Sequence, residues 1–387
     1  MTGTGQRGRA QSRPPRVRAR RGAFGRGFRQ RNPLVLVAGA IVAVLFLLLL
    51  QAAVTSGDFT VVSQGRYDRI ANDDYVRVTY ELGKLKKDPP QGTTVYLFGG
   101  SGTIESFVTQ KALAAAIAKA GGGDVNVISL AAHQQTLAQT LAIIDNLPPG
   151  KGVLLIGLAP SRLSPSPKQD VGLLSGRPII APSPWLAKLA PKLYGKSAPH
   201  GGVIPGIFDY LGSYLRQRAA TGPFWGLSIP YAIHYYPPGA KGALPLAKRQ
   251  NIFKVLRRDR KAYRANADYN FAVLRQIVLL GKERGYQVVL YDQPLNFSAG
   301  GPTWGGVLPV YQKRAEAMAK QLGVPYIHIE RGADLSDADF ADLYHLLQSG
   351  RLKWQAELAR LLAPITRSVT AAPAAGMPAA TPSPASS

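Results

Sequence analysis

The chain has 387 residues, of which 46% are hydrophobic, and a formal net charge of +25 at pH 7. This length suits a folded domain of ordinary size with peripheral segments to spare. It contains no cysteine, which excludes disulfide bonds, thiolate metal sites and a cysteine nucleophile.

The N-terminus predicts a membrane anchor. Residues 1–32 hold ten arginines and no acidic residue, and residues 33–54 carry no charge. About 20 apolar residues span a bilayer core, and this stretch is longer than the apolar part of a signal peptide. We therefore expect an uncleaved transmembrane helix, although Ala52-Ala53 leaves cleavage open.

The arginine cluster also suggests a location. Arginines bind phosphates, so a nucleic-acid partner is one interpretation of the cluster. Its position directly before the apolar stretch instead favours a cytoplasmic N-terminus with the rest of the chain exported. We expect no nucleic-acid partner, and a bacterial cytoplasmic (inner) membrane protein with a periplasmic domain.

The exported part begins with a predicted stalk, residues 55–91, which ends at the breaker Asp88-Pro-Pro90. Short apolar runs then alternate with helical patterns, which is typical of an α/β fold whose parallel sheet is covered by helices. The predicted strands are 94–98, 125–130, 152–158, 287–291 and 325–329. A domain over residues 92–365 with a parallel sheet of about five strands is the expected architecture.

Two predicted helices show a clear apolar face. One carries Phe271, Leu274 and Val278, and the other carries apolar side chains from Tyr311 to Leu322 before Gly323. Residues 159–250 are rich in Pro, Gly, Tyr and Trp without a steady period, so we expect an insertion beside the site. Residues 366–387 predict a disordered Ala/Pro/Ser tail.

Three residues suggest nucleophilic catalysis. Ser101 follows the first predicted strand across two glycines, in Phe98-Gly-Gly-Ser-Gly102, and Asp342 and His345 lie near the end of the domain. They supply a nucleophile, an orienting acid and a base. Residues three apart on a helical turn share a face, so Asp342 is expected to hold one ring nitrogen of His345 while the other faces Ser101.

These motifs resemble the SGNH (GDSL-like) hydrolase superfamily, and in particular its membrane-anchored envelope acyltransferase and esterase branch. The specific parts are Phe98-Gly-Gly-Ser-Gly102 and Asp342-Leu-Tyr-His345, and the resemblance covers roughly residues 92–363 without the insertion. It implies a three-layer SGNH-like fold with Ser101, Asp342 and His345 as catalytic residues.

The chain also departs from the family pattern. Gly100 stands where the family has an Asp beside the serine, and the segment Gly157-Leu-Ala-Pro-Ser161 lacks the family's Asn. The resemblance places the oxyanion hole at backbone N–H groups of Ser101 and Ala132. No cofactor is expected, and no spacing in the sequence matches a zinc or calcium site.

Several alternatives accompany these assignments. Ser101 suits a helix cap as well as a nucleophile, and Glu105 is expected to point along the following helix. His133 competes with His345 for the role of base, whereas His328 fits a structural role in its strand. The other histidines are His200 and His234.

The function implied by the resemblance is transfer or hydrolysis of acyl groups, commonly acetyl, on a cell-surface or secreted polysaccharide such as cellulose. A multi-pass membrane acyltransferase is the partner that such relatives have. A phosphate-binding turn at residues 98–103 is disfavoured because no P-loop lysine follows. The remaining alternative is a non-catalytic envelope protein that binds or assembles polysaccharide on the same fold.

Overall fold

The computed structural model describes residues 33–56, 74–170, 183–194, 234, 246–297, 299 and 306–371. The chain divides into two compact units, Met1–Leu50 and Gln51–Ser387. Helix α2, Pro33–Ser56, starts in the first unit, and its large apolar side chains are exposed from Leu34 to Leu49. The side chains that the structure describes in α2 end at Leu49, and among the residues so described no helix is long and apolar enough to cross a membrane.

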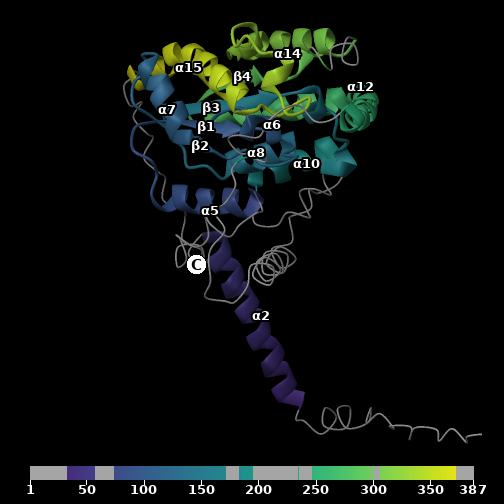
Figure 1. The fold of residues 1–387 in the computed structure, drawn as a ribbon. Helices are drawn as coiled ribbons and strands as arrows, with labels where there is room; N and C mark the ends of the chain where they lie inside the picture. Colours follow the sequence, from purple (N-terminus) through teal and green to yellow (C-terminus); the bar gives the residue numbers. More distant parts are fainter. Residues whose placement is uncertain are drawn as a thin grey trace, which may run out of the picture. The chain divides into compact units, whose positions relative to one another are not determined.

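A five-stranded parallel sheet forms the centre of the second unit (Figure 1). Its strands are β1 Thr93–Phe98, β2 Val125–Ser129, β3 Gly152–Leu158, β4 Gln287–Asp292 and β5 Tyr326–Ile327. They lie in the order β2-β1-β3-β4-β5, and all four neighbouring pairs are parallel. The predicted α/β class and the parallel sheet are therefore confirmed. The predicted strand 325–329 is shorter than expected because the chain turns into the 3-10 helix η2, Ile329–Arg331.

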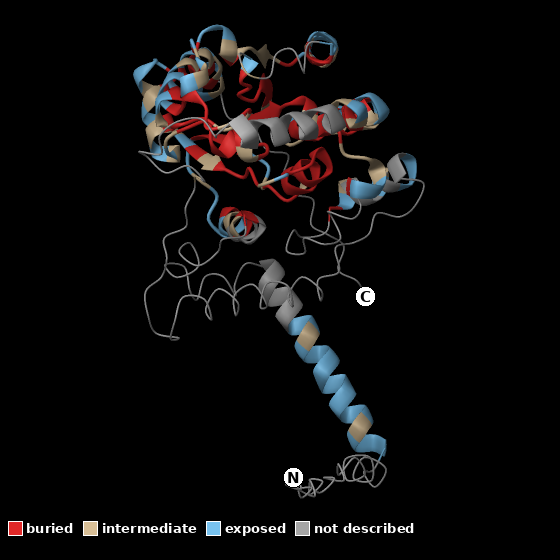
Figure 2. Ribbon diagram, turned by 45° about the vertical axis from the view of Figure 1, so that its right-hand side comes forward, coloured by how far each residue is buried: buried red, intermediate tan, exposed pale blue. Residues whose placement is uncertain are grey.

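Helices cover both faces of this sheet. Along β1, Val95 and Leu97 pack into one apolar cluster and Tyr96 and Phe98 into another, because successive side chains of a strand point to opposite faces. The first cluster contains side chains from α7, Gln110–Lys119, and α15, Gln348–Ala371. The second contains side chains from α5 Asp74–Lys87, α8 Leu137–Asp145, α12 Leu246–Glu283 and α14 Leu308–Leu322. The buried residues are concentrated between these layers (Figure 2).

The remaining described helices are short. They are α6 Ser101–Ile104, α10 Pro184–Tyr194, η1 Pro160–Leu163 and η3 Asp337–Asp339. The two helical faces predicted from the sequence are buried as expected, with Phe271, Leu274 and Tyr311 in the core. Gly323 ends α14 in a left-handed conformation at φ 60°, which a glycine adopts without steric cost.

The predicted stalk is wrong in its second half. Helix α5 lies within residues 55–91, and its Val78, Leu82 and Leu85 are buried in the core. Its polar side chains lie between these apolar ones, so the helix docks on the domain by one face. The folded domain therefore includes residues from Asp74 onward.

Two other boundaries also differ from prediction. Helix α15 continues to Ala371, so residues 366–371 are not part of a tail, and buried Thr366 donates a hydrogen bond to the Gly122 carbonyl at 2.9 Å. Within the predicted insertion, η1 places Leu163 in the core and α12 starts at Leu246. The rest of both segments lies outside the described residues, apart from α10, the stretch from Ser164 to Asp170, Ser183 and His234.

Candidate active site

A tight turn between β1 and α6 presents Ser101. Gly99 and Gly100 form the turn, and Ser101 is the first residue of α6. A Cβ atom on Gly99 would lie 1.9 Å from Thr103 Oγ1, so only glycine fits there. The first N–H groups of a helix have no acceptor within the helix, and the Ser101 N–H is one of these groups.

Buried hydrogen bonds hold this turn in place. Thr103 Oγ1 lies 2.8 Å from Tyr291 Oη and accepts a bond from Gln293 Nε2 at 2.8 Å. Burial raises the pKa of Tyr291 to about 12, so its hydroxyl stays protonated. Gly99 N–H donates to Gln135 Oε1 at 3.2 Å. The turn that carries Ser101 is thus tied to β4 and to the segment that follows β2.

Asp342 and His345 lie in a bend between η3 and α15. The predicted helical turn is not formed, because an isolated antiparallel bridge between Phe340 and Leu346 and the Ala341 N–H bond to the His345 carbonyl close the segment into a loop. Asp342 Oδ1 accepts the N–H groups of Tyr344 and His345 at 2.8 and 2.9 Å. The aspartate therefore holds the backbone of the loop as well as the imidazole.

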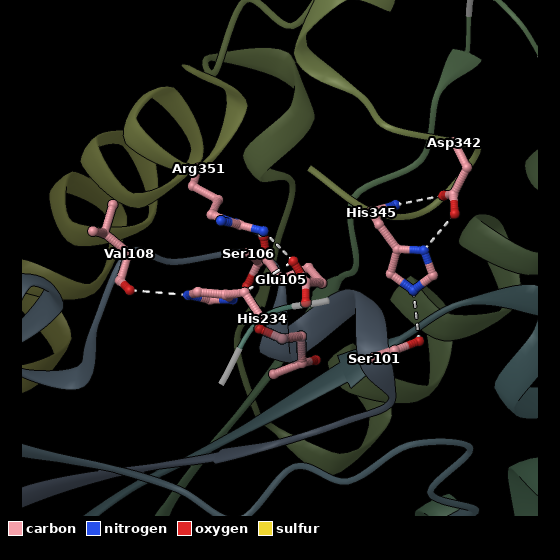
Figure 3. A network of polar contacts seen from close by, with 9 residues as sticks. Ser101, Glu105, Ser106, Val108, His234, Asp342, His345 and Arg351 are labelled. Carbon is pink, nitrogen blue, oxygen red and sulfur yellow. Dashed lines mark hydrogen bonds and ion pairs between the residues drawn. The ribbon is translucent and has the colours of Figure 1, made fainter. Parts of the chain in front are cut away.

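The three predicted residues meet in one hydrogen-bonded chain (Figure 3). His345 Nε2 lies 2.8 Å from Ser101 Oγ, and His345 Nδ1 lies 2.6 Å from Asp342 Oδ2. Both side chains of the loop are largely buried, with exposed fractions of 18% for His345 and 10% for Asp342. Burial alone would raise the pKa of Asp342, but the hydrogen bond and charge of His345 outweigh it and the net shift is downward. Asp342 is consequently held as a carboxylate.

The oxyanion-hole assignment of Ala132 is wrong. Ala132 follows β2 and is fully buried, and its N–H donates to the Gly99 carbonyl at 3.1 Å. This bond consumes the donor, so Ala132 joins the two strand ends instead of facing the site. The role of the Ser101 N–H as a backbone donor stays a prediction.

The competing histidines lie apart from this chain of contacts. His133 pairs with Asp74 at the start of α5, and its own N–H donates to the same carboxylate at 2.8 Å. His328 contacts Asp292 and Glu316. Nε2 of His234 lies 3.0 Å from the carbonyl oxygen of Val108. His200 lies outside the described residues.

A buried ion pair links the two halves of the site, and the sequence did not reveal it. Glu105, expected to point along its helix, is fully buried and pairs with Arg351 of α15, which is also fully buried (Figure 3). His234 Nδ1 lies 3.5 Å from the same carboxylate. The pair joins the segment after Ser101 to the helix after His345. Its only sequence signal was an acidic residue four positions after the serine.

Other features lie away from the triad. A cavity of about 520 Å³ is lined by the end of α5, by β2 and by the start of α7, and contains none of the three triad residues. Among the described residues, one group has the composition to hold a metal ion, namely Asp292, His328 and Glu330.

Comparisons with known proteins add no identification. No model of a protein family matches this chain, and no curated protein matches it either. The arguments for its function therefore rest on its own residues.

Proposed function

We propose that this protein is a serine acyltransferase or esterase of the SGNH type that uses Ser101, His345 and Asp342. The observation that carries the proposal is the unbroken chain of contacts from Ser101 Oγ through both ring nitrogens of His345 to Asp342. A histidine hydrogen-bonded to a serine on one side and a carboxylate on the other is the arrangement that activates a serine hydroxyl.

The first half of the reaction forms an acyl-enzyme. Ser101 Oγ attacks the carbonyl carbon of an ester while His345 Nε2 takes the hydroxyl proton. Asp342 stabilises the resulting imidazolium and fixes its orientation, and the Ser101 N–H is directed at the developing oxyanion. His345 then returns the proton to the departing alcohol oxygen.

The second half transfers the acyl group onward. A hydroxyl group or water donates its proton to His345 Nε2 and attacks the acyl carbon, and the proton returns to Ser101 Oγ as the ester bond to the enzyme breaks. A sugar hydroxyl as attacker gives transfer, and water gives hydrolysis. Both outcomes use the same residues.

The setting belongs to the same proposal. Residues 33–54 anchor the chain in a bacterial cytoplasmic membrane, with the ten arginines of residues 1–32 on the cytoplasmic side. The domain then faces the periplasm, where a polysaccharide such as cellulose or another exopolysaccharide is either the acceptor of the acyl group, commonly acetyl, or the acylated substrate. A multi-pass membrane acyltransferase supplies the acyl group across the membrane. These assignments rest on the resemblance and on the charge pattern.

Covalent labelling tests the proposal. A fluorophosphonate probe is expected to label the full-length protein once, and Ser101→Ala is expected to abolish the labelling. Ser161→Ala is the matched control, because Ser161 is a partly exposed serine in η1, directly after β3. Equal labelling of wild type and Ser101→Ala would refute Ser101 as the nucleophile. No labelling and no turnover of an aryl acetate by wild type would favour a non-catalytic, polysaccharide-binding protein.

A further inference from the structure

Two carboxylates and one imidazole converge at the carboxyl ends of β4 and β5. Asp292 is the last residue of β4, His328 follows β5, and Glu330 belongs to η2. One ligand atom from each lies within 4.8 Å of the other two. Asp292 precedes His328 by 36 positions and Glu330 by 38. Their sequence spacing therefore matches no known metal motif.

Two of the three separations between the donor atoms are those of a metal site. His328 Nδ1 lies 3.3 Å from Asp292 Oδ2 and 3.2 Å from Glu330 Oε1. Zinc binds histidine nitrogen and carboxylate oxygen at about 2.0–2.2 Å, which puts the ligand atoms of a tetrahedral site about 3.3 Å apart. Three protein ligands leave a fourth position for water.

The groups around these ligands hold them in that orientation. Tyr311 Oη and Tyr326 Oη both donate to Asp292 Oδ1, at 2.5 and 2.6 Å. Asp292 Oδ2 faces His328 and also accepts a hydrogen bond from Gln312 Nε2 at 3.2 Å. His328 Nε2 lies 2.6 Å from Glu316 Oε1. A ligand histidine in a metal site commonly bonds a carboxylate through its other nitrogen in this way.

Glu330 adds an independent observation. Its Oε2 is buried and has no hydrogen-bond partner among the described residues. The negative charge of Asp292 also lies near the Glu330 carboxylate. A cation at this point would satisfy it.

A protonated His328 is the competing explanation. The hydrogen bond to Asp292 raises the pKa of His328 to about 9 despite its burial. One imidazolium brings a single positive charge, while Asp292, Glu316 and Glu330 bring three negative ones. Arg331 reaches Glu316 only at 4.0 Å and is largely exposed. A divalent ion balances the group better than a proton does.

We propose that Asp292, His328 and Glu330 bind a zinc ion that ties the short edge strand β5 and η2 to β4. Strand β5 pairs with β4 through only two residues, Tyr326 and Ile327. The mixed nitrogen and oxygen donors suit zinc better than magnesium or calcium, which prefer oxygen alone. None of the three ligands belongs to the chain of contacts of Ser101, His345 and Asp342.

Zinc titration of the full-length protein in detergent tests this site. After dialysis against a chelator, isothermal titration with zinc chloride is expected to show one equivalent bound per chain. His328→Gln is expected to abolish the binding. Glu330→Gln is expected to weaken it by at least about 10-fold, and Glu316→Gln by about 10- to 100-fold as an outer partner. Bound zinc should also raise the unfolding temperature of wild type.

Two controls keep the outcome decisive. His133→Gln removes another histidine paired with a carboxylate but no third ligand, and it should keep full zinc stoichiometry. If His328→Gln does not fold, Glu330→Gln carries the test, since circular dichroism can establish its folding. No saturable binding by wild type, or equal binding by wild type and Glu330→Gln, would overturn the proposal and assign the cluster to a protonated histidine.

Discussion

The domain contains two similar histidine–aspartate pairs that do different things. His345 with Asp342 and His133 with Asp74 each place ring Nδ1 on a carboxylate, and each histidine also donates its backbone N–H to that carboxylate. Only His345 meets the hydroxyl of Ser101. A histidine–aspartate pair alone therefore does not indicate catalysis. The two pairs differ in the group that contacts the second ring nitrogen, which for His345 is the Ser101 hydroxyl.

The second pair has a mechanical role in this comparison. Asp74 stands at the start of α5, and Arg77 of the same helix donates to the carbonyls of Ser129 and Ala131, both at 2.5 Å. These contacts clamp α5 to the segment that follows β2. His133 thus helps to hold α5 on the domain, whereas His345 moves a proton only under the proposed function.

The largest expected effect separates the two histidines by activity. His345→Ala should lower turnover of an aryl acetate by several orders of magnitude, because Ser101 loses its base. His133→Ala should cost far less. Ser101→Ala combined with His345→Ala should be little worse than either change alone, since triad members act as a unit. A larger loss from His133→Ala would exchange the roles assigned to the two pairs.

The next test compares the two aspartates. Asp342→Asn should lose nearly as much activity as His345→Ala while remaining folded, because the amide favours the wrong tautomer of the imidazole. Asp74→Asn should leave kcat per folded molecule nearly unchanged but lower the free energy of unfolding by about 1–3 kcal/mol, because buried donors lose their carboxylate. Urea unfolding beside steady-state kinetics measures both. Similar losses of kcat in the two variants would contradict the different roles assigned to Asp342 and Asp74.

A third test changes the turn that positions Ser101, the residue that only one of the two pairs contacts. Gly99→Ala should destabilise the fold by about 1–3 kcal/mol or displace Ser101, because the new Cβ would collide with Thr103. Gly100→Ala is the matched control, since no atom lies within 4 Å of its Cβ position. Labelling of Ser101 and thermal unfolding report the effect. Equal behaviour of the two variants would mean that the turn tolerates a side chain.

The smallest expected effect is in the pH dependence of stability. The pKa of Asp342 is lowered in the folded state, so its contribution is present above the unfolded pKa of about 3.9 and is lost as pH falls through the lower folded value. The stability advantage of wild type over Asp342→Asn should therefore shrink only below about pH 4. Urea unfolding between pH 7 and 3 checks it, and an advantage that already disappears near pH 6 would contradict the lowered pKa.

The sheet could be predicted because its strands are unbroken apolar runs. Strand 152–158 was predicted with its observed bounds, and three others differ by one residue at one end. The same local pattern placed Ser101 at a strand end. The Asp342 and His345 contact was also predictable from their spacing, although the loop that creates it was not, since it depends on the bridge from Phe340 to Leu346.

Long-range partners account for what the sequence did not reveal. The burial of α5 depends on a core formed by distant segments, and Ala132 lost its assigned role because its N–H bonds Gly99 across the sheet. The ion pair of Glu105 and Arg351 joins residues 246 positions apart. A local sequence pattern cannot predict such contacts, because each partner taken alone has the sequence context of an ordinary charged surface residue.

The distance along the chain between Ser101 and His345, 244 residues, has a consequence for timing. A chain is synthesised from its N-terminus, so the serine is made well before the histidine. Contacts of such separation form late, because a long segment must be ordered first. Under the proposed function, an incomplete or truncated chain therefore contains Ser101 without its base. Activity starts only when the loop that carries His345 has packed against the folded sheet.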